Sequence, residues 1–255
     1  MIGRKKKKYK VGIALGGGGT RGYAHLGVLQ ALKEKGIEPD IISGVSAGAI
    51  AGSLIAAGKT PEEAFVFIKK YGFTDFSQLQ LPKNGGLLSL EKMRKTLEKE
   101  LRVLRIEDLK IPLIITVSDV LKGKVEYMHK GPLALTVQAS AAIPVLYSPV
   151  EMNGTVYCDG GLFDNLPVKP LKNRCDKIIG VSISPVQELK AIDGIIQMAS
   201  RVFELGVNAD RAEIRKVCDV YIEPPALVNH DILDTKHADE IFEIGYSYAK
   251  GLDIG

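Results

Sequence analysis

Residues 41–50 read as a short apolar strand, a tight turn that carries a serine, and an apolar helix, and this stretch constrains the fold most. The turn, residues 44–48, has the pattern G-x-S-x-G. So sharp a strand-to-helix corner leaves no room for side chains two residues on either side of the serine, which explains Gly44 and Gly48. The Ser46 hydroxyl would stand beside the positive end of the helix, where developing negative charge is stabilised. The pattern predicts a nucleophile elbow; a glycine-rich connection between a buried strand and a buried helix is the alternative.

The elements around this stretch have the order of a parallel sheet. Residues 10–15 read as a first buried strand, and a glycine loop over residues 16–22 leads into a helix that Gly36 ends. The serine-bearing strand and its helix follow. The order strand, loop, helix, strand, turn, helix is typical of a parallel sheet, so we expect an α/β fold.

The rest of the chain continues as a single domain, since 255 residues fall near the upper limit for one domain. Residues 72–86 have no clear period and are expected to be a loop, either a lid or a plain connection. Asn153-Gly154 predicts a hairpin turn. Two amphipathic helices are expected to end the chain, over residues 192–216 and 238–250.

Composition excludes several classes of protein. The chain is 45% hydrophobic and 25% charged, as in ordinary globular proteins, and no apolar run reaches the ~18 residues of a membrane span. The apolar run after the basic start is too short for a secretory signal. Cys158, Cys175 and Cys218 have no metal-ligand spacing and are interpreted as packing residues in a reducing compartment. We therefore expect a cytoplasmic protein, with peripheral contact at the inner face of the membrane.

The glycine loop admits two interpretations. Residues 17–22 contain G-x-G-x-x-G between a strand and a helix, which suggests a dinucleotide site. That site also needs an acidic residue at the carboxyl end of the second strand, whereas Asp40 precedes its strand. In the other interpretation the N–H groups of Gly17, Gly18 and Gly19 face the serine and cradle the oxyanion of an acyl-transfer intermediate.

A nucleophilic serine needs a base, and the histidines fit that role poorly. Two of them, His25 and His129, fall inside a helix and at the end of a strand. The others, His230 and His237, lie in a late polar loop, where an order Ser…Asp…His could recruit one of them. The remaining candidate is Asp159, which precedes two glycines that allow close backbone approach; a turn aspartate is its ordinary role. For Arg21, the ordinary role of a solvated residue at a helix start stays open.

Four blocks of the sequence together resemble the patatin-like phospholipase family. In chain order they are residues 15–22 followed by His25-Leu26-Gly27-Val28-Leu29, then Gly44-Val45-Ser46-Ala47-Gly48, Ala139-Ser140-Ala141-Ala142-Ile143-Pro144, and Asp159-Gly160-Gly161 with Asn165-Leu166-Pro167-Val168. The resemblance is closest to the short bacterial members. It implies a three-layer α/β/α fold, a Ser46–Asp159 dyad, an oxyanion hole at Gly17 to Gly19, and acyl-ester hydrolysis without a metal or cofactor.

These features predict an acyl hydrolase domain over residues 11–255 that acts on phospholipids or lysophospholipids through an acyl-enzyme. A general carboxylesterase for soluble esters is one alternative. A signalling or scaffold protein that keeps the fold without activity is another. Residues 1–10 form a basic arm that we expect to be flexible, and neither a nucleic-acid partner nor a particular oligomer is indicated.

The basic arm predicts weak membrane contact. It holds six basic residues, so the remaining body has 28 basic against 30 acidic residues and is nearly neutral. Near an anionic membrane each basic residue contributes about 1 kcal/mol, screened beyond a Debye length. We expect co-sedimentation with anionic but not neutral vesicles at low salt, and loss of this binding when residues 1–8 are deleted. Binding that survives the deletion or high salt would place the attraction elsewhere.

Overall fold

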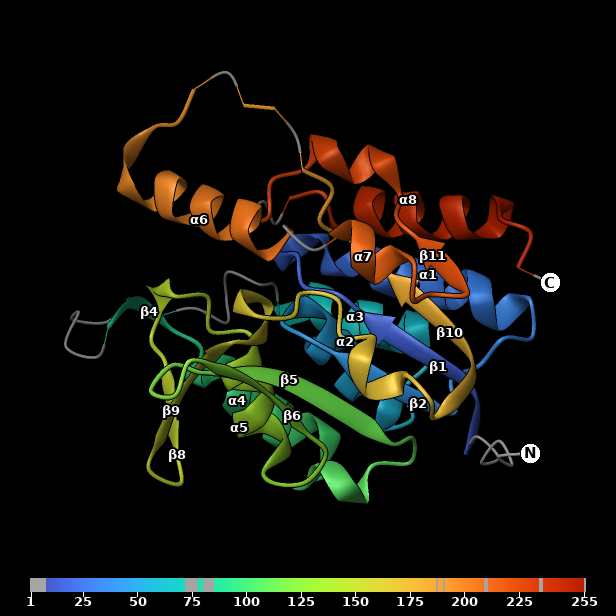
Figure 1. The fold of residues 1–255 in the computed structure, drawn as a ribbon, viewed down its shortest axis with the longest axis horizontal. Coiled ribbons are helices and arrows are strands. Elements are labelled where there is room, and N and C mark those ends of the chain that lie inside the picture. Colours follow the sequence, from blue (N-terminus) through green and yellow to red (C-terminus); the bar gives the residue numbers. More distant parts are fainter. Residues whose placement is uncertain are drawn as a thin grey trace, which may run out of the picture.

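A mixed, mostly parallel sheet forms the centre of the protein (Figure 1). The computed structural model describes residues 8–71, 78–79, 85–186, 188–189, 191–208, 211–233 and 236–254. The strand order is β11-β10-β1-β2-β5-β9-β8, and β6 also pairs with β5. The strands are β1 (Tyr9–Leu15), β2 (Ile41–Gly44), β5 (Leu113–Asp119), β6 (Lys124–Met128), β8 (Val150–Met152), β9 (Thr155–Asp159), β10 (Cys175–Val181) and β11 (Val220–Ile222).

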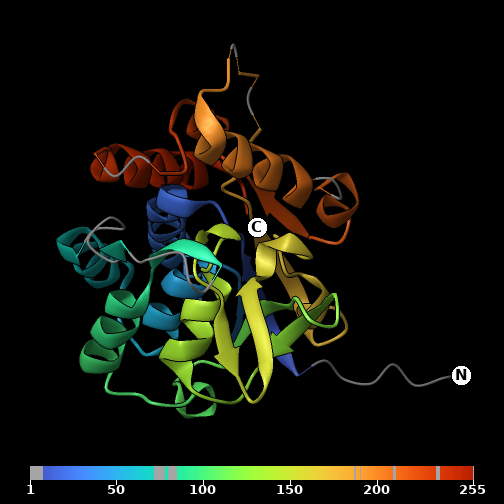
Figure 2. The same ribbon diagram turned by 90° about the vertical axis from the view of Figure 1, so that its left-hand side faces the viewer.

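Helices flank the sheet, and a small second sheet lies beside it (Figure 2). The helices are α1 (Tyr23–Glu34), α2 (Ala47–Ala56), α3 (Pro61–Tyr71), α4 (Glu91–Leu101), α5 (Leu133–Ser140), α6 (Gly194–Val207), α7 (Arg211–Arg215) and α8 (Ala238–Gly251). Short 3-10 helices are η1 (Gly19–Gly22), η3 (Ile106–Asp108), η4 (Gly160–Leu162), η5 (Lys169–Leu171) and η6 (Pro225–Asn229). The second sheet has the order β3 (Gln78–Leu79), β4 (Gly86–Ser89), β7 (Val145–Tyr147). None of the helices in the described ranges has the length and hydropathy of a bilayer-crossing segment.

The strand register brings three segments together at one edge of the sheet. β1 and β2 are parallel, with Leu15 opposite Gly44, so the loops that follow them leave the same edge. β5 is parallel to β2, with Ile115 opposite Gly44, and it continues past that edge to Asp119. β9 pairs with this extension in the antiparallel direction, with Asp159 opposite Val117. Asp159 therefore ends its strand just beyond the edge where β2 turns into α2.

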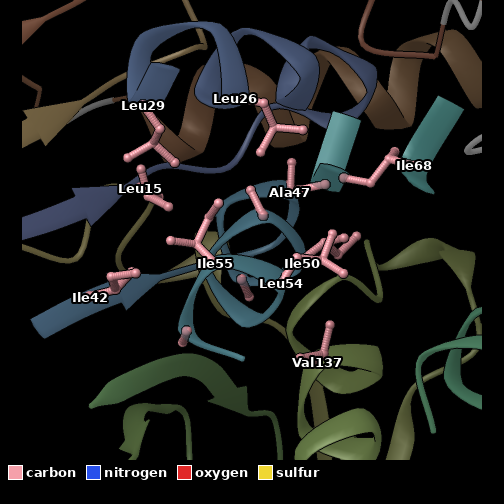
Figure 3. Close-up of a cluster of buried hydrophobic side chains, with 14 of the residues drawn as sticks. Leu15, Leu26, Leu29, Ile42, Ala47, Ile50, Leu54, Ile55, Ile68 and Val137 are labelled. Atoms are coloured by element: carbon pink, nitrogen blue, oxygen red, sulfur yellow. The ribbon is translucent and has the colours of Figure 1, made fainter. Parts of the chain in front are cut away.

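The two faces of the sheet bury alternate residues of each strand, as the period of two requires. Ile13, Leu15 and Ile42 belong to the larger core, in which α1 and α2 pack on the sheet (Figure 3). Ala14 and Ile41, one residue out of step, belong to a second cluster. Leu166, Leu171 and Cys175 are members of that cluster, and Ile214 and Cys218 pack against it. Apolar cores on both faces of the sheet are what a three-layer arrangement requires, as expected from the sequence.

Most elements lie where the sequence predicts them, and several turn signals act as expected. The hairpin between β8 and β9 has a positive φ at both Asn153 (51°) and Gly154 (74°), which this two-residue turn requires. The prediction of one helix over residues 192–216 is wrong, because the structure has two helices there, α6 and α7. The Asn208 side chain donates a hydrogen bond to the Glu204 carbonyl at 2.7 Å, and Asn208 leaves the helical conformation. The loop expected over residues 72–86 lies mostly outside the described residues, as do residues 1–7 of the arm.

Helices α1 and α8 are in extensive contact, and glycines set their separation. A Cβ at Gly245 of α8 would lie 2.3 Å from the Ala24 carbonyl oxygen, and one at Gly27 of α1 would lie 2.0 Å from the Phe242 carbonyl oxygen. Backbone atoms at these distances cannot move aside without shifting a helix. Gly251, at the end of α8, has open space around the same position.

We therefore expect Gly245→Ala to lower the free energy of unfolding by ~1–3 kcal/mol, the usual cost of overpacking. The matched variant Gly251→Ala adds the same atom in open space and is expected to be neutral or to stabilise by up to ~1 kcal/mol. Urea unfolding of both variants measures the difference. Equal stability of the two would contradict the close packing of α1 and α8.

Candidate active site

Ser46 occupies a backbone conformation that few side chains adopt. It directly precedes the first residue of α2, as its N-cap, with φ 52° and ψ −122°. A Cβ at Gly48 would lie 2.1 Å from the Leu15 carbonyl oxygen, and one at Gly44 would lie 2.6 Å from the Gly48 carbonyl oxygen. Only glycine therefore fits at either position, and the strained turn presents Ser46 at the edge of the sheet.

Ser140 holds this strained turn in place. The Ser46 N–H donates to Ser140 Oγ at 2.9 Å, and Ser140 Oγ donates to the Thr116 carbonyl at 2.7 Å. The hydroxyl therefore connects the turn to β5, and all three residues are buried. Sequence reasoning assigned no role to Ser140, although the residue lies in one of the recognised blocks.

Asp159 is a buried carboxylate with an unusual pKa. Its Oδ1 accepts a hydrogen bond from the Gly161 N–H at 2.8 Å. Burial raises the pKa of Asp159 to about 7, and the Ser46 hydroxyl and the Gly161 N–H oppose this rise. Oδ2 is also buried, and no hydrogen bond of good geometry to it is present among the described residues. A carboxylate next to a serine with a pKa near neutrality is suited to accept and return a proton.

Two of the three predicted oxyanion donors are free. The Gly17 N–H donates to the Asn165 carbonyl at 3.1 Å and is therefore engaged. The N–H groups of Gly18 and Gly19 have no hydrogen-bond acceptor among the described residues, and both glycines line the same cavity as Ser46. The arrangement offers Gly18 and Gly19 to a negative oxygen and leaves Gly17 as part of the loop's support.

Buried polar side chains fix the glycine loop. His25 Nε2 donates to the Gly16 carbonyl at 2.7 Å, and Ser184 Oγ donates to the Gly17 carbonyl at 2.6 Å. Burial lowers the pKa of His25 to about 4, so the ring is neutral and carries its proton on Nε2. His25 therefore supports the glycine loop through the Gly16 carbonyl and does not line the cavity at Ser46.

The interpretation of Arg21 as a solvated helix start is wrong. Its side chain is only 1% exposed. Nε donates to the His230 carbonyl at 2.7 Å, and Nη1 donates to the Pro185 carbonyl at 3.2 Å and lies 3.6 Å from Glu204 Oε1. Burial lowers the pKa of Arg21, while Glu204 and Asp231 oppose this. Arg21 thus joins the glycine loop to α6 and to two later loops.

The residues required by the competing interpretations lie away from the cavity at Ser46. His230 Nε2 lies 3.6 Å from Glu240 Oε1, and its ring lies 5.5 Å from that of His237. Asp40 accepts hydrogen bonds from the N–H groups of Lys10 and Val11, at the amino end of β1. The dinucleotide interpretation therefore lacks its acidic residue at the edge where the glycine loop lies.

A small cavity of about 20 Å³ joins these groups. No histidine is found among the described residues that line it, which are Gly17, Gly18, Gly19, Ser46, Ile143, Asp159, Asn165, Ser184, Phe203, Glu204, Val207 and Ile232. Three of them, Phe203, Glu204 and Val207, come from α6, which sequence reasoning did not connect with the site. This helix covers the cavity, and Ser46 is only 6% exposed.

The architecture is the patatin fold, with a mixed, mostly parallel sheet between helices. A solved structure with this arrangement, VipD from Legionella pneumophila, superimposes with a TM-score of 0.60 and 16% identity, over 98% of this chain and 71% of that one. A sequence profile described as patatin-like phospholipase matches residues 13–172. The chain therefore belongs to the patatin-like phospholipase family, and membership supports a lipid hydrolase.

Sequence relatives agree with this assignment. An uncharacterised NTE family protein of Mycobacterium tuberculosis is 38% identical over 178 residues, which are 69% of this chain and 49% of that protein. Lysophospholipase NTE1 of Candida glabrata is 30% identical over 276 residues, covering 94% of this chain and 16% of that protein. The chain thus spans about half the length of the mycobacterial relative and a small part of the yeast enzyme.

The raised pKa of Asp159 predicts a pH-dependent cost in stability. The pKa of Asp159 is about 7 in the folded protein and 3.8 ordinarily. The stability that the protonated carboxyl contributes to the fold is therefore fully present below about pH 4 and is lost as the pH rises through 7. Asp159→Asn keeps an acceptor for Gly161 and cannot ionise. We expect it to raise the melting temperature clearly at pH 8.5 and little at pH 4.5. The exposed control Asp176→Asn should show no such difference; an equal effect of both variants would refute the buried-charge explanation.

Proposed function

We propose that the chain is a serine acyl hydrolase that cleaves fatty-acyl esters of phospholipids or lysophospholipids. The observation that carries this proposal is the shared cavity of Ser46 and Asp159, with two free N–H donors and no histidine in its described lining. Family membership and the similarity to a lysophospholipase support a lipid ester as the substrate.

In the proposed reaction, Asp159 accepts the Ser46 proton while Ser46 Oγ attacks the ester carbonyl. The N–H groups of Gly18 and Gly19 stabilise the oxyanion of the tetrahedral intermediate. Its collapse breaks the bond to the leaving alcohol, which takes the proton from Asp159 and leaves an acyl-serine. Asp159 then accepts a proton from water, whose oxygen attacks the acyl carbon, and returns a proton to Ser46 as the fatty acid is released.

A carboxylate can serve as the base here because the site excludes water. An exposed aspartate, with a pKa near 4, is a weak acceptor for a serine proton. Burial raises the pKa of Asp159 to about 7, which strengthens it as a base while it remains ionised in mildly alkaline solution. The N–H groups near Ser46 and the amino end of α2 favour the negative charge that forms on the substrate oxygen.

The dyad is tested by active-site labelling and turnover. A fluorophosphonate probe should label the native protein on Ser46 and leave Ser46→Ala unlabelled. Asp159→Asn should reduce turnover of a soluble ester by about 10²–10⁴-fold, the usual contribution of a general base. The pH profile of kcat/KM should rise through about pH 7, because Asp159 must be ionised. Loss of turnover in His230→Ala or His237→Ala, with Asp159→Asn still active, would replace the dyad with a triad.

A substrate panel decides between the proposal and its alternatives. Nitrophenyl esters of increasing acyl length are compared with lysophospholipid and phospholipid in vesicles. Preference for long acyl chains and lipid aggregates supports the proposal, whereas preference for short soluble esters favours a general carboxylesterase. A folded protein that turns over none of them and does not react with the probe would have a non-catalytic role.

A further inference from the structure

The catalytic cavity is too small for the proposed substrate. Its volume of about 20 Å³ has room for little more than one water molecule, whereas ligand sites usually measure ~300–1,000 Å³. Phe203, Glu204 and Val207 of α6 contribute to its cover. Among the described residues, part of this cover must move before an acyl ester fits at Ser46, and α6 is the helix that contributes most residues to the cover.

The outer side of α6 is apolar. Its exposed apolar side chains recur at spacings of three, four and three residues and so form one stripe along the helix: Ile195 (81% exposed), Met198 (49%), Val202 (61%) and Leu205 (48%). Among the described side chains of α6, the two charged ones, Arg201 and Glu204, are each only 12% exposed and pair with one another at 2.8 Å. The stripe itself therefore carries no charge.

Neighbouring elements extend this apolar surface. Val145 of β7, Leu162 of η4 and the following Phe163 are exposed, and both β7 and η4 contact α6. Val145 has φ 71°, an unusual conformation for a β-branched residue, and its side chain points to solvent although the strand contains buried Leu146. We call the seven exposed residues the α6 patch: Ile195, Met198, Val202, Leu205, Val145, Leu162 and Phe163.

We propose that the α6 patch docks on the lipid surface that contains the substrate, and that docking draws α6 away from Ser46. This inference rests on the proposed function. The helix has the two faces that such a role needs, since Phe203 and Val207 line the cavity at Ser46 while the residues of the stripe are exposed. The patch is thus continuous with the entrance that the lipid must use.

Charge distribution favours a lipid partner over a protein partner. An uncharged helix stripe matches the acyl region of a bilayer, and its apolar side chains gain free energy on leaving water. Protein interfaces usually surround such a stripe with a polar rim, whereas Gln197 is the one exposed polar side chain among the described side chains of α6. The substrate itself lies in the phase that the patch fits.

An ion pair between Glu204 of α6 and Arg21 links the helix to the glycine loop. Glu204 lies 3.6 Å from the buried Arg21 and 2.8 Å from Arg201. Arg21 belongs to the short helix that begins at Gly19, one of the free oxyanion donors. Movement of α6 separates Glu204 from Arg21 and opens the cavity beside the donors. The same contact thus keeps the site closed in water and yields when the stripe enters lipid.

The test compares two exposed double variants. Val202→Ser with Leu205→Ser removes the centre of the stripe; Leu104→Ser with Leu121→Ser removes exposed leucines from other segments, 70% and 65% exposed. Both variants are tested on neutral phosphatidylcholine vesicles at high salt, which the basic arm alone is not expected to bind; native binding there measures the α6 patch, and its absence overturns the docking role. We expect the stripe variant to lose about tenfold or more in vesicle binding and vesicle hydrolysis, as for ~1.4 kcal/mol of lost transfer energy. Its rate on a soluble short-chain ester, and both properties of the control, should stay unchanged.

The possible results separate this inference from the function itself. If the stripe variant binds vesicles as tightly as the native protein and still hydrolyses the soluble ester, the docking role is overturned and the dyad is unaffected. If the native protein is a dimer, and the stripe variant is monomeric but binds vesicles unchanged, a second copy covers the patch. This result also overturns the docking role. Absence of all ester hydrolysis contradicts the proposed function, and vesicle binding then still decides whether the patch docks on lipid.

The ion pair between Glu204 and Arg21 gives a second readout that needs no vesicles. Glu204→Gln removes the charge that holds α6 to Arg21, so Ser46 should react severalfold faster with a soluble fluorophosphonate. The matched control Glu98→Gln removes an ion pair with Arg94 on α4 and should react at the native rate. Equal rates for Glu204→Gln and the native protein would show that α6 does not limit access to Ser46.

Discussion

The close approach of α2 to the end of β1 is the contact on which the site depends. Gly48 lies against the Leu15 carbonyl, and the Val45 N–H donates to that same carbonyl at 3.1 Å. Because Gly16 follows Leu15 directly, the glycine loop and the Ser46 turn share one fixed point. A shift of one loop would therefore disturb the other, which favours a constant position of the proposed oxyanion donors relative to the serine. Such preorganisation is the main source of electrostatic catalysis.

The site also contains a buried carboxylate, which lowers the stability of the folded protein. Burial raises the pKa of Asp159, so ionising this carboxyl, as the proposed reaction requires, costs free energy in the folded protein. The surrounding structure tolerates that cost because β5 extends past the sheet edge and holds β9 in register beside it. Stability lost at a functional group and retained elsewhere is common in enzymes.

The sequence predicted the elements whose signals are local. The strand and helix around Ser46, the β8–β9 hairpin and the parallel β1–β2 pair all follow from short patterns of glycine and apolar residues. Contacts between distant segments left no such trace. Nothing near Arg21 in sequence indicates that residues 185, 204 and 230 will bury it. Likewise, the periodicity of residues 192–216 gave an amphipathic helix but not the break at Asn208, nor which side of it would face the cavity.

The two surfaces with a proposed affinity for membranes lie at opposite ends of the strands. β1 starts at Tyr9, next to the basic arm, and its seven residues span ~23 Å before the glycine loop. Helix α6, which carries the α6 patch, lies toward the other end of the strand (Figure 1). Attraction of a basic arm to anionic lipid acts over about a Debye length and sets no orientation, whereas burial of an apolar stripe requires contact. In the docking that we propose, contact through α6 presents the cavity at Ser46 to the lipid, so the stripe and not the arm determines which face meets the substrate.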